Sequence, residues 1–369
     1  MDLEGELRVG LRVSAGRIEQ IRIGSTRPDV AHALLQGRTS DEIRAAVPLL
    51  FSICNRSQAA ASELAIGAAA TGAKPGSQAL ERCSAAVAAE IVRECAWRTL
   101  LDWPLRIDER PGADAVAAAR ASLSFHPGTN DGTAENFIAV AALGVGAEEW
   151  LALRSLSELD RWIDAGATAS ARFIRRVRDD DVAASAGGDT AAPQVPLLDD
   201  LDRAASMQEL WNACDADPGF ARHPTWRGAP AETGALARLR SDPLIGALRR
   251  RSASRVTARF VARLRELALL LAGRGSAAVG AQAVAPGGGI AWVENARGLL
   301  VHQVRLEQGR ASIYRIVAPT EWNFHPRGAL ATALVNSPAG ELDGVEKRVT
   351  RLVDSLDPCV LCHVEFDDA

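Results

Sequence analysis

Helix-forming segments fill the middle of this chain, while segments that alternate apolar with polar residues occur near its two ends. The N-terminal alternation spans residues 6–24 around a Ser-Ala-Gly turn, which predicts a β-hairpin. From residue 290 the alternation returns, and two of its runs flank the tight turn "EQGR". The chain is therefore expected to adopt an α+β, mostly helical fold, a helical body with small β-hairpins from its N- and C-terminal segments.

The helices follow from apolar spacing and from cap residues such as Ser40. Two stretches rich in small residues, near 183–196 and 274–289, are expected to be flexible within a single domain spanning 1–369. Seven arginines between 249 and 265 are interpreted as a solvated helix face. The expected helices cover residues 28–36, 40–46, 54–71, 77–101, 112–123, 133–143, 147–153, 156–178, 232–241, 243–273 and 343–356.

Composition excludes several functional classes. Of the 369 residues 47% are hydrophobic and 24% charged, and the net charge is -4, so no nucleic-acid partner is indicated. The N-terminus lacks the basic and apolar regions of a signal peptide. The longest apolar run, residues 264–273, is far shorter than the about 20 residues that span a bilayer. We expect no membrane association and a cytoplasmic location.

The most reactive side chains stand close to the end of the chain, in "DPCVLC". Thiolates at Cys359 and Cys362 can reach one ion, and soft thiolates suit iron, zinc, nickel or cuprous copper. Asp357-Pro358 is expected to stop the preceding helix. Alone, this motif also fits a redox pair or two ordinary cysteines in a frayed tail, and His363 beside it is expected to be solvated. Cys83, Cys95 and Cys214 are interpreted as buried or incidental residues.

Three separated stretches together narrow these alternatives. "RLVDSLDPCVLC" (351–362) resembles the end of the [NiFe]-hydrogenase large subunit. "VENARGLLVHQVRLEQGRASIYRIVAPTEWNFHPRG" (293–328) resembles that family's "EAPRGxxxH…PTxWN…PR" segment. "VPLLFSICNRSQAAA" (47–61) resembles its N-terminal "RxCGxCxxxH" segment. The order of the three stretches agrees as well.

Departures from that family's pattern fall on the nickel side. The first N-terminal ligand cysteine is replaced by Phe51, so that only Cys54 of the pair remains, and the histidine that follows is replaced by Gln58. The proton-relay glutamate falls near His32. Glu365 occupies the place where the family's maturation endopeptidase cuts, so we expect no tail to be removed.

This combination resembles the HupK/HoxV-type hydrogenase assembly proteins. The resemblance implies a non-enzymatic scaffold that transiently holds iron carrying CN and CO ligands, the Fe(CN)2(CO) unit, before delivery to the hydrogenase large subunit. Implied partners are a HypC-type maturation chaperone and its iron-carrying partner. Implied ligands are Cys359, Cys362 and Cys54.

Arg297 is expected to donate a hydrogen bond to a cyanide ligand, with Asp357 orienting it and Glu294 bracing its loop. His302 is expected to be a hydrogen-bonded core residue rather than a ligand. Two other functions stay open: a divergent catalytic subunit, and an unrelated zinc or redox CxxC protein.

Overall fold

The computed structural model describes residues 5–26, 30–51, 53–128, 132–186, 194–198, 203–251 and 254–367. The chain forms two compact units, where the sequence suggested one domain. The first comprises Met1–Val87, Ala192–Ala237 and Ala278–Ala369, and the second comprises Ala88–Ala191 and Arg238–Ala277. In the described part of the chain no helix is long and apolar enough to cross a membrane.

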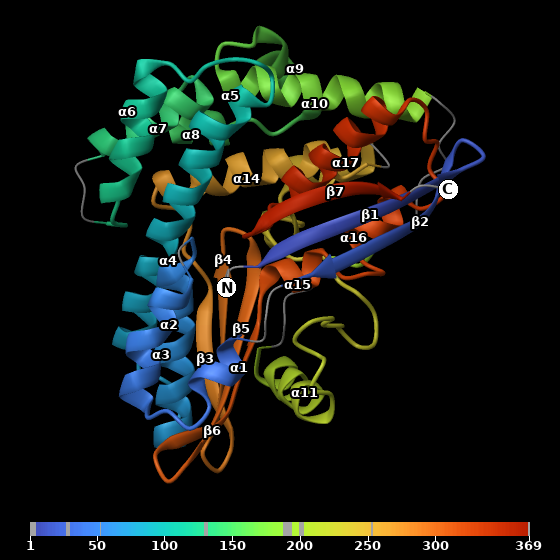
Figure 1. Ribbon diagram of the computed structural model, residues 1–369. Helices are drawn as coiled ribbons and strands as arrows, with labels where there is room; N and C mark the ends of the chain where they lie inside the picture. The colour runs from blue at the N-terminus through green and yellow to red at the C-terminus, as the bar shows by residue number, and fades with distance from the viewer. Residues whose placement is uncertain are drawn as a thin grey trace. The chain divides into compact units, whose positions relative to one another are not determined.

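The first unit contains a three-stranded sheet that joins the two ends of the chain (Figure 1). Strands β1 (Glu6–Ser14) and β2 (Arg17–Ser25) form the predicted hairpin. Strand β7 (Leu361–Asp367) lies parallel to β1, with Cys362 opposite Leu7. The alternative of a frayed tail is therefore wrong, because Cys362 belongs to a sheet.

The second sheet has four antiparallel strands in sequential order: β3 (Val279–Ala285), β4 (Gly288–Asn295), β5 (Gly298–Glu307) and β6 (Arg310–Val317). The predicted EQGR turn joins β5 to β6. Residues 279–285 were expected to be flexible, but they form β3. They pair with β4, where a Cβ on Gly280 would lie only 2.2 Å from the Trp292 ring.

Helix α3 (Asn55–Thr71) packs on this sheet and carries the sequence that follows Cys54. Small residues make the approach possible: a Cβ on Gly289 of β4 would lie 2.2 Å from the carbonyl oxygen of Ala65. The preceding helix α2 (Ser40–Leu50) is capped by Thr39 rather than by Ser40, because Thr39 and Glu42 form a capping box. The first unit also contains α1 (Val30–Leu35), α11 (Arg203–Ala216), α12 (Ala235–Arg238), α15 (Pro319–Asn323), α16 (Ala329–Leu334) and α17 (Leu342–Leu356).

The second unit is helical. Helix α4 (Ser77–Trp97) enters it and continues as a π-helical turn, Arg98–Asp102, and then as α5 (Trp103–Leu105), so the helical run extends past its expected end at residue 101. The expected helix over 156–178 is two helices, because Gly166 adopts a left-handed conformation between them. The unit also contains α6 (Ala113–Ala121), α7 (Thr133–Leu143), α8 (Ala147–Leu151), α9 (Leu156–Ala165), α10 (Ala169–Ala186), α13 (Pro243–Arg251) and α14 (Val256–Leu271).

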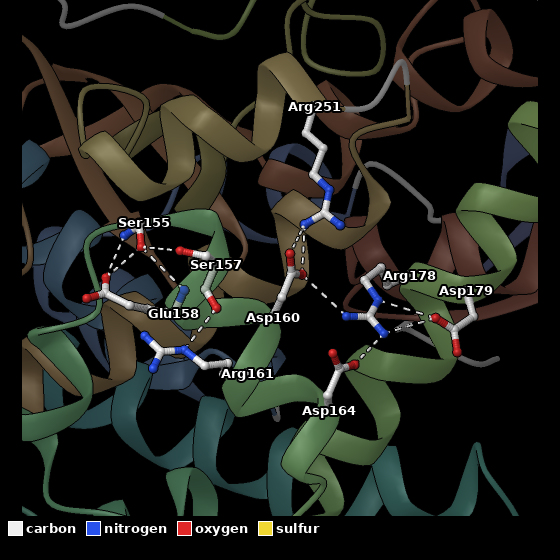
Figure 2. A network of polar contacts seen from close by, with 9 residues as sticks. All are labelled: Ser155, Ser157, Glu158, Asp160, Arg161, Asp164, Arg178, Asp179 and Arg251. Atoms are coloured by element: carbon white, nitrogen blue, oxygen red, sulfur yellow. Dashed lines mark hydrogen bonds and ion pairs between the residues drawn. The ribbon is translucent and has the colours of Figure 1, made fainter.

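The interpretation of the arginines as a solvated face is wrong for α14 and the residue before it. Arg255, Arg259, Arg263 and Arg265 are buried, and Arg265 donates to Asp242 Oδ2 at 3.0 Å and to the Leu151 carbonyl oxygen at 3.0 Å. Figure 2 shows a related network, in which Asp160 of α9 accepts hydrogen bonds from Arg178 and Arg251. Acidic partners on neighbouring segments allow guanidinium groups to be buried. The spacing of the arginines along the sequence did not reveal these acidic partners.

The other expected flexible stretch, 183–196, is only partly described. Helix α10 extends to Ala186, and residues 187–193 lie outside the described residues. Val195 is buried, and the Pro196 carbonyl oxygen accepts from the Glu232 N–H at 2.9 Å. The end of this stretch is therefore anchored in the first unit.

Candidate metal centre

The CxxC loop begins where α17 ends. The Asp357 N–H donates to the Val353 carbonyl oxygen at 2.9 Å, and Asp357 adopts a left-handed conformation with φ 53°. Pro358 then prevents the helix from continuing. The predicted helix stop is confirmed, and the chain leaves it through Cys359 into β7, which contains Cys362.

Thr320 of α15 contacts Cys359 at two points. Its Oγ1 lies 3.1 Å from Cys359 Sγ and accepts a hydrogen bond from the Cys359 N–H at 3.3 Å. Since that oxygen accepts from the backbone, its hydroxyl hydrogen is available to the sulfur. Sequence reasoning did not assign Thr320 a role, although the "PTEWN" stretch containing it was part of the matched segment.

Arg297 and Asp357 form a buried ion pair, with Arg297 Nε 3.8 Å from Asp357 Oδ2. The two side chains are 3% and 7% exposed. The structure thus brings together two of the residues that the sequence suggested for this site. Because Asp357 stands two residues before Cys359, the pair places a guanidinium group next to the cysteine loop.

The backbone around Arg297 is held by polar side chains. Asn295 Oδ1 accepts from the Arg297 N–H at 2.9 Å, and Asn323 Nδ2 donates to the Arg297 carbonyl oxygen at 3.3 Å. Gly298 has φ 136°, and a Cβ there would lie 2.4 Å from Thr233 Cγ2. This accounts for glycine after the arginine. Glu294, expected to brace the loop, is buried at the end of β4.

Cys362 and its neighbour His363 differ in exposure. Burial, with a smaller contribution from the nearby Asp354 carboxylate, raises the pKa of the Cys362 thiol to about 11. The thiol therefore stays protonated near neutral pH. His363, expected to be solvated, is half exposed, and its Nε2 lies 3.6 Å from Glu6 Oε1.

Cys54 is the N-cap residue of α3, where its side chain makes no capping hydrogen bond, and it is 8% exposed. Gln58 Nε2 lies 3.8 Å from its sulfur, and Gln58 Oε1 lies 2.8 Å from His302 Nε2. His302 also contacts Tyr314 Oη through Nδ1 at 2.8 Å, and its complete burial lowers its pKa to about 3. The expectation that His302 is a hydrogen-bonded core residue is confirmed.

The structure does not bring the three candidate ligands into one preformed site. Among the described residues no group of three or more His, Cys, Asp or Glu side chains is placed to hold a metal ion. The expected set of Cys54, Cys359 and Cys362 therefore stays a prediction. Cys83, Cys95 and Cys214 are buried, as expected. The His32 side chain lies outside the described part of the structure.

Comparison with known proteins defines the class of this fold. Residues 256–365 match the family model for nickel-dependent hydrogenase. The structure aligns with that of a [NiFeSe] hydrogenase variant from Desulfovibrio vulgaris Hildenborough over 94% of each chain, with a TM-score of 0.55 and 16% sequence identity. The chain has a [NiFe]-hydrogenase large-subunit-like fold.

Full-length relatives define the family more closely. The chain is 30% identical over 372 residues to the hydrogenase expression/formation protein HupK of Rhizobium leguminosarum bv. viciae, covering 99% of this chain and 97% of the relative. It is 31% identical to the hydrogenase expression/formation protein HoxV of Cupriavidus necator, covering 94% and 93%. The chain belongs to this HupK/HoxV family of hydrogenase expression/formation proteins.

Proposed function

We propose that this protein is a non-catalytic scaffold in [NiFe]-hydrogenase maturation that transiently holds the Fe(CN)2(CO) unit as cargo. The accessory role is supported by the relatives, which are named as hydrogenase expression/formation proteins. The observation that carries the iron assignment is the meeting of the CxxC loop with the buried Arg297–Asp357 pair.

The residues of the loop suit this cargo chemically. Cysteine thiolates bind iron, and Cys359 and Cys362 are three residues apart, Cys359 in the loop after α17 and Cys362 near the start of β7. A cyanide nitrogen carries negative charge, and a buried guanidinium group donates a short, strong hydrogen bond to such an acceptor. Asp357 pairs with the Arg297 guanidinium group and orients it. Thr320 contributes a hydroxyl at the Cys359 sulfur.

An incomplete protein ligand set is consistent with transient holding. The diatomic ligands occupy three coordination positions of the iron, so the cargo needs few thiolates. Cys54 is proposed as the third protein ligand, reached when the cargo draws α3 and the loop together. A closed site of four protein ligands would instead favour permanent retention.

The proposed partners follow from this role. A HypC-type chaperone and its iron-carrying partner would supply the cargo, and the hydrogenase large subunit would receive it. In a pull-down of the tagged protein, the chaperone is expected to co-purify, and the Cys359→Ala variant is expected to exchange less iron with it.

The deciding experiment is an infrared spectrum of the protein, purified without oxygen from cells that express the maturation machinery. Bands in the CO and CN stretching window are expected, and they should be lost in Cys359→Ala but kept in the matched control Cys83→Ala. A silent window with about one zinc per chain would overturn the scaffold function in favour of a plain thiolate zinc site. Hydrogen turnover by the purified chain would instead support a divergent catalytic subunit.

A further inference from the structure

A chain of buried polar side chains runs from Cys54 into the core of the first unit. It passes from the Cys54 sulfur to Gln58, then to His302 of β5 and Tyr314 of β6. Gln58 is 2% exposed, and His302 and Tyr314 are 0% exposed. Buried polar groups of this kind are costly unless each is satisfied, so their hydrogen bonds must agree in direction.

The positions of the atoms specify that direction. Gln58 presents Nε2 to the cysteine sulfur and Oε1 to His302. An amide oxygen only accepts, so His302 Nε2 must carry the proton in this contact. A neutral imidazole then accepts at Nδ1, and the Tyr314 hydroxyl donates to it. Each hydrogen bond in the series therefore points toward Cys54.

We infer that Gln58 is a positioning residue that donates a hydrogen bond to the Cys54 sulfur, with its amide held in that orientation by His302 and Tyr314. The inference rests on the proposed function, in which Cys54 binds the cargo iron as a thiolate. The Cys54 sulfur then accepts the hydrogen bond from Gln58. Donors to a coordinating sulfur draw electron density away from the metal and so tune it.

The local geometry explains why the amide reaches the sulfur. Gln58 follows Cys54 by four residues at the start of α3, and residues with that spacing lie on one face of a helix. The packing of α3 against β5 then brings His302 to the far side of the amide. Hydrophobic side chains at 58 or 302 would leave the sulfur without this donor.

A reversed series is the competing arrangement. If the Gln58 amide were turned over, the Cys54 thiol would donate to its oxygen and His302 would be protonated at Nδ1. The two arrangements place the side chains in the same positions, but they exchange the amide nitrogen and oxygen of Gln58 and require different His302 tautomers. That tautomer is therefore the direct measure of the inference.

The first test uses the iron-free protein and is independent of any cargo. The ring nitrogens of His302 are observed by ¹⁵N NMR and assigned by their loss in His302→Asn. A neutral ring protonated at Nε2 is the expected result. A ring protonated at Nδ1, or at both nitrogens, overturns the inference without touching the proposed function.

The second test uses the iron-loaded protein and the nearly isosteric variant Gln58→Glu. The variant keeps an acceptor for His302 but removes the donor to Cys54. We expect the CO and CN bands to shift to lower frequency, while the control Gln208→Glu, a charge change on the exposed face of α11, leaves them in place. Unshifted bands at equal iron content overturn the inference. A wild-type protein without bands counts against the proposed function, and the tautomer still decides the direction of the series.

Discussion

Arg297 Nε lies 3.8 Å from Asp357 Oδ2, and both side chains are almost fully buried. The pair links the turn between β4 and β5 to the residue at which α17 ends. Two charges removed from water are tolerated when each compensates the other, and removal of one leaves the other buried and uncompensated. The same contact therefore matters for stability and for the orientation of the guanidinium group.

Asp357→Asn removes the charge of this residue while keeping its backbone conformation. Asparagine tolerates the left-handed conformation that Asp357 adopts at φ 53°, so the helix end should persist while the charge is lost. We expect the free energy of unfolding to fall by about 3 kcal/mol in urea titrations. Asp357→Ala should lose more, because alanine is also strained there. Equal stability of Asp357→Asn and wild type would show that the pair is not needed to balance Arg297.

Cys359→Ala tests the cysteine loop. The loop precedes the last strand, and its side chain is partly exposed, so little of the core depends on the thiol. We expect an unchanged far-ultraviolet circular dichroism spectrum and a free energy of unfolding within about 1 kcal/mol of wild type. Iron retained after anaerobic purification and hydrogenase maturation in the cell should both be abolished. Normal maturation by this variant would exclude the CxxC as the scaffold site.

Alkylation rates report on the thiol of Cys362. Its pKa is raised to about 11, mainly by burial, so its thiolate fraction at pH 8 should be about 100-fold lower than that of a thiol with a pKa of 9. In iron-free Cys359→Ala protein, site-resolved alkylation at Cys362 is expected to keep rising up to about pH 11.

Asp354→Asn is the matched control for that titration. It removes the carboxylate that also raises the pKa of Cys362, so the rise in alkylation should begin at lower pH. A rate that levels off by about pH 9 in the parent variant would contradict the assigned environment.

Much of the fold could be predicted from the sequence because the patterns that indicate it are local. Alternation predicted β1, β2, β5 and β6, and the Asp357-Pro358 stop predicted the end of α17. Two signals were missing. The buried arginines of α14 look polar along the chain, and only acidic side chains on other segments, such as Asp242 for Arg265, make their burial possible. The small residues of β3 look like a linker, and only the Trp292 ring shows why residue 280 has no side chain.

The residues of the candidate site also fall into those with a local sequence signal and those without one. Cys359, Asp357 and Arg297 stand in motifs and were predicted, and the structure brings Arg297 to Asp357. Thr320 was missed because no sequence spacing marks a threonine hydroxyl as a site residue. Its contact with Cys359 depends on how α15 packs beside the loop. The series from Cys54 to Tyr314 was missed because its members come from a helix and two strands.

The pH dependence of stability should reveal His302. Its pKa is lowered to about 3 by burial, whereas an unfolded histidine has a pKa near 6.5. Because the unfolded chain takes up a proton first, the stability that neutral His302 contributes is present above about pH 6.5 and is lost as the pH falls toward 3. Between pH 7 and pH 4 this should amount to about 3 kcal/mol.

The measurement is the difference between two pH profiles of the free energy of unfolding. His302→Gln supplies an amide that does not titrate, so its profile should be flatter by about that amount below pH 6.5. The acidic groups titrate in both proteins and cancel in the difference. Parallel profiles would mean that His302 is accessible to protons in the folded protein.

Gly289→Ala tests the packing that positions Cys54. A Cβ at residue 289 would lie 2.2 Å from the Ala65 carbonyl oxygen and 2.6 Å from the Ala69 backbone nitrogen, so α3 would have to move away from β4. Both obstructing atoms are backbone, which cannot rotate aside, and overpacking of a core costs about 1–3 kcal/mol or more. Gly76→Ala is the control, since nothing lies within 4 Å of a Cβ there. We expect a lower midpoint in urea for Gly289→Ala alone, and also a loss of the His302 contact with Gln58, seen as a changed ¹⁵N shift. A stable Gly289→Ala protein with the wild-type shift would show that α3 is held to the sheet less closely than these distances require.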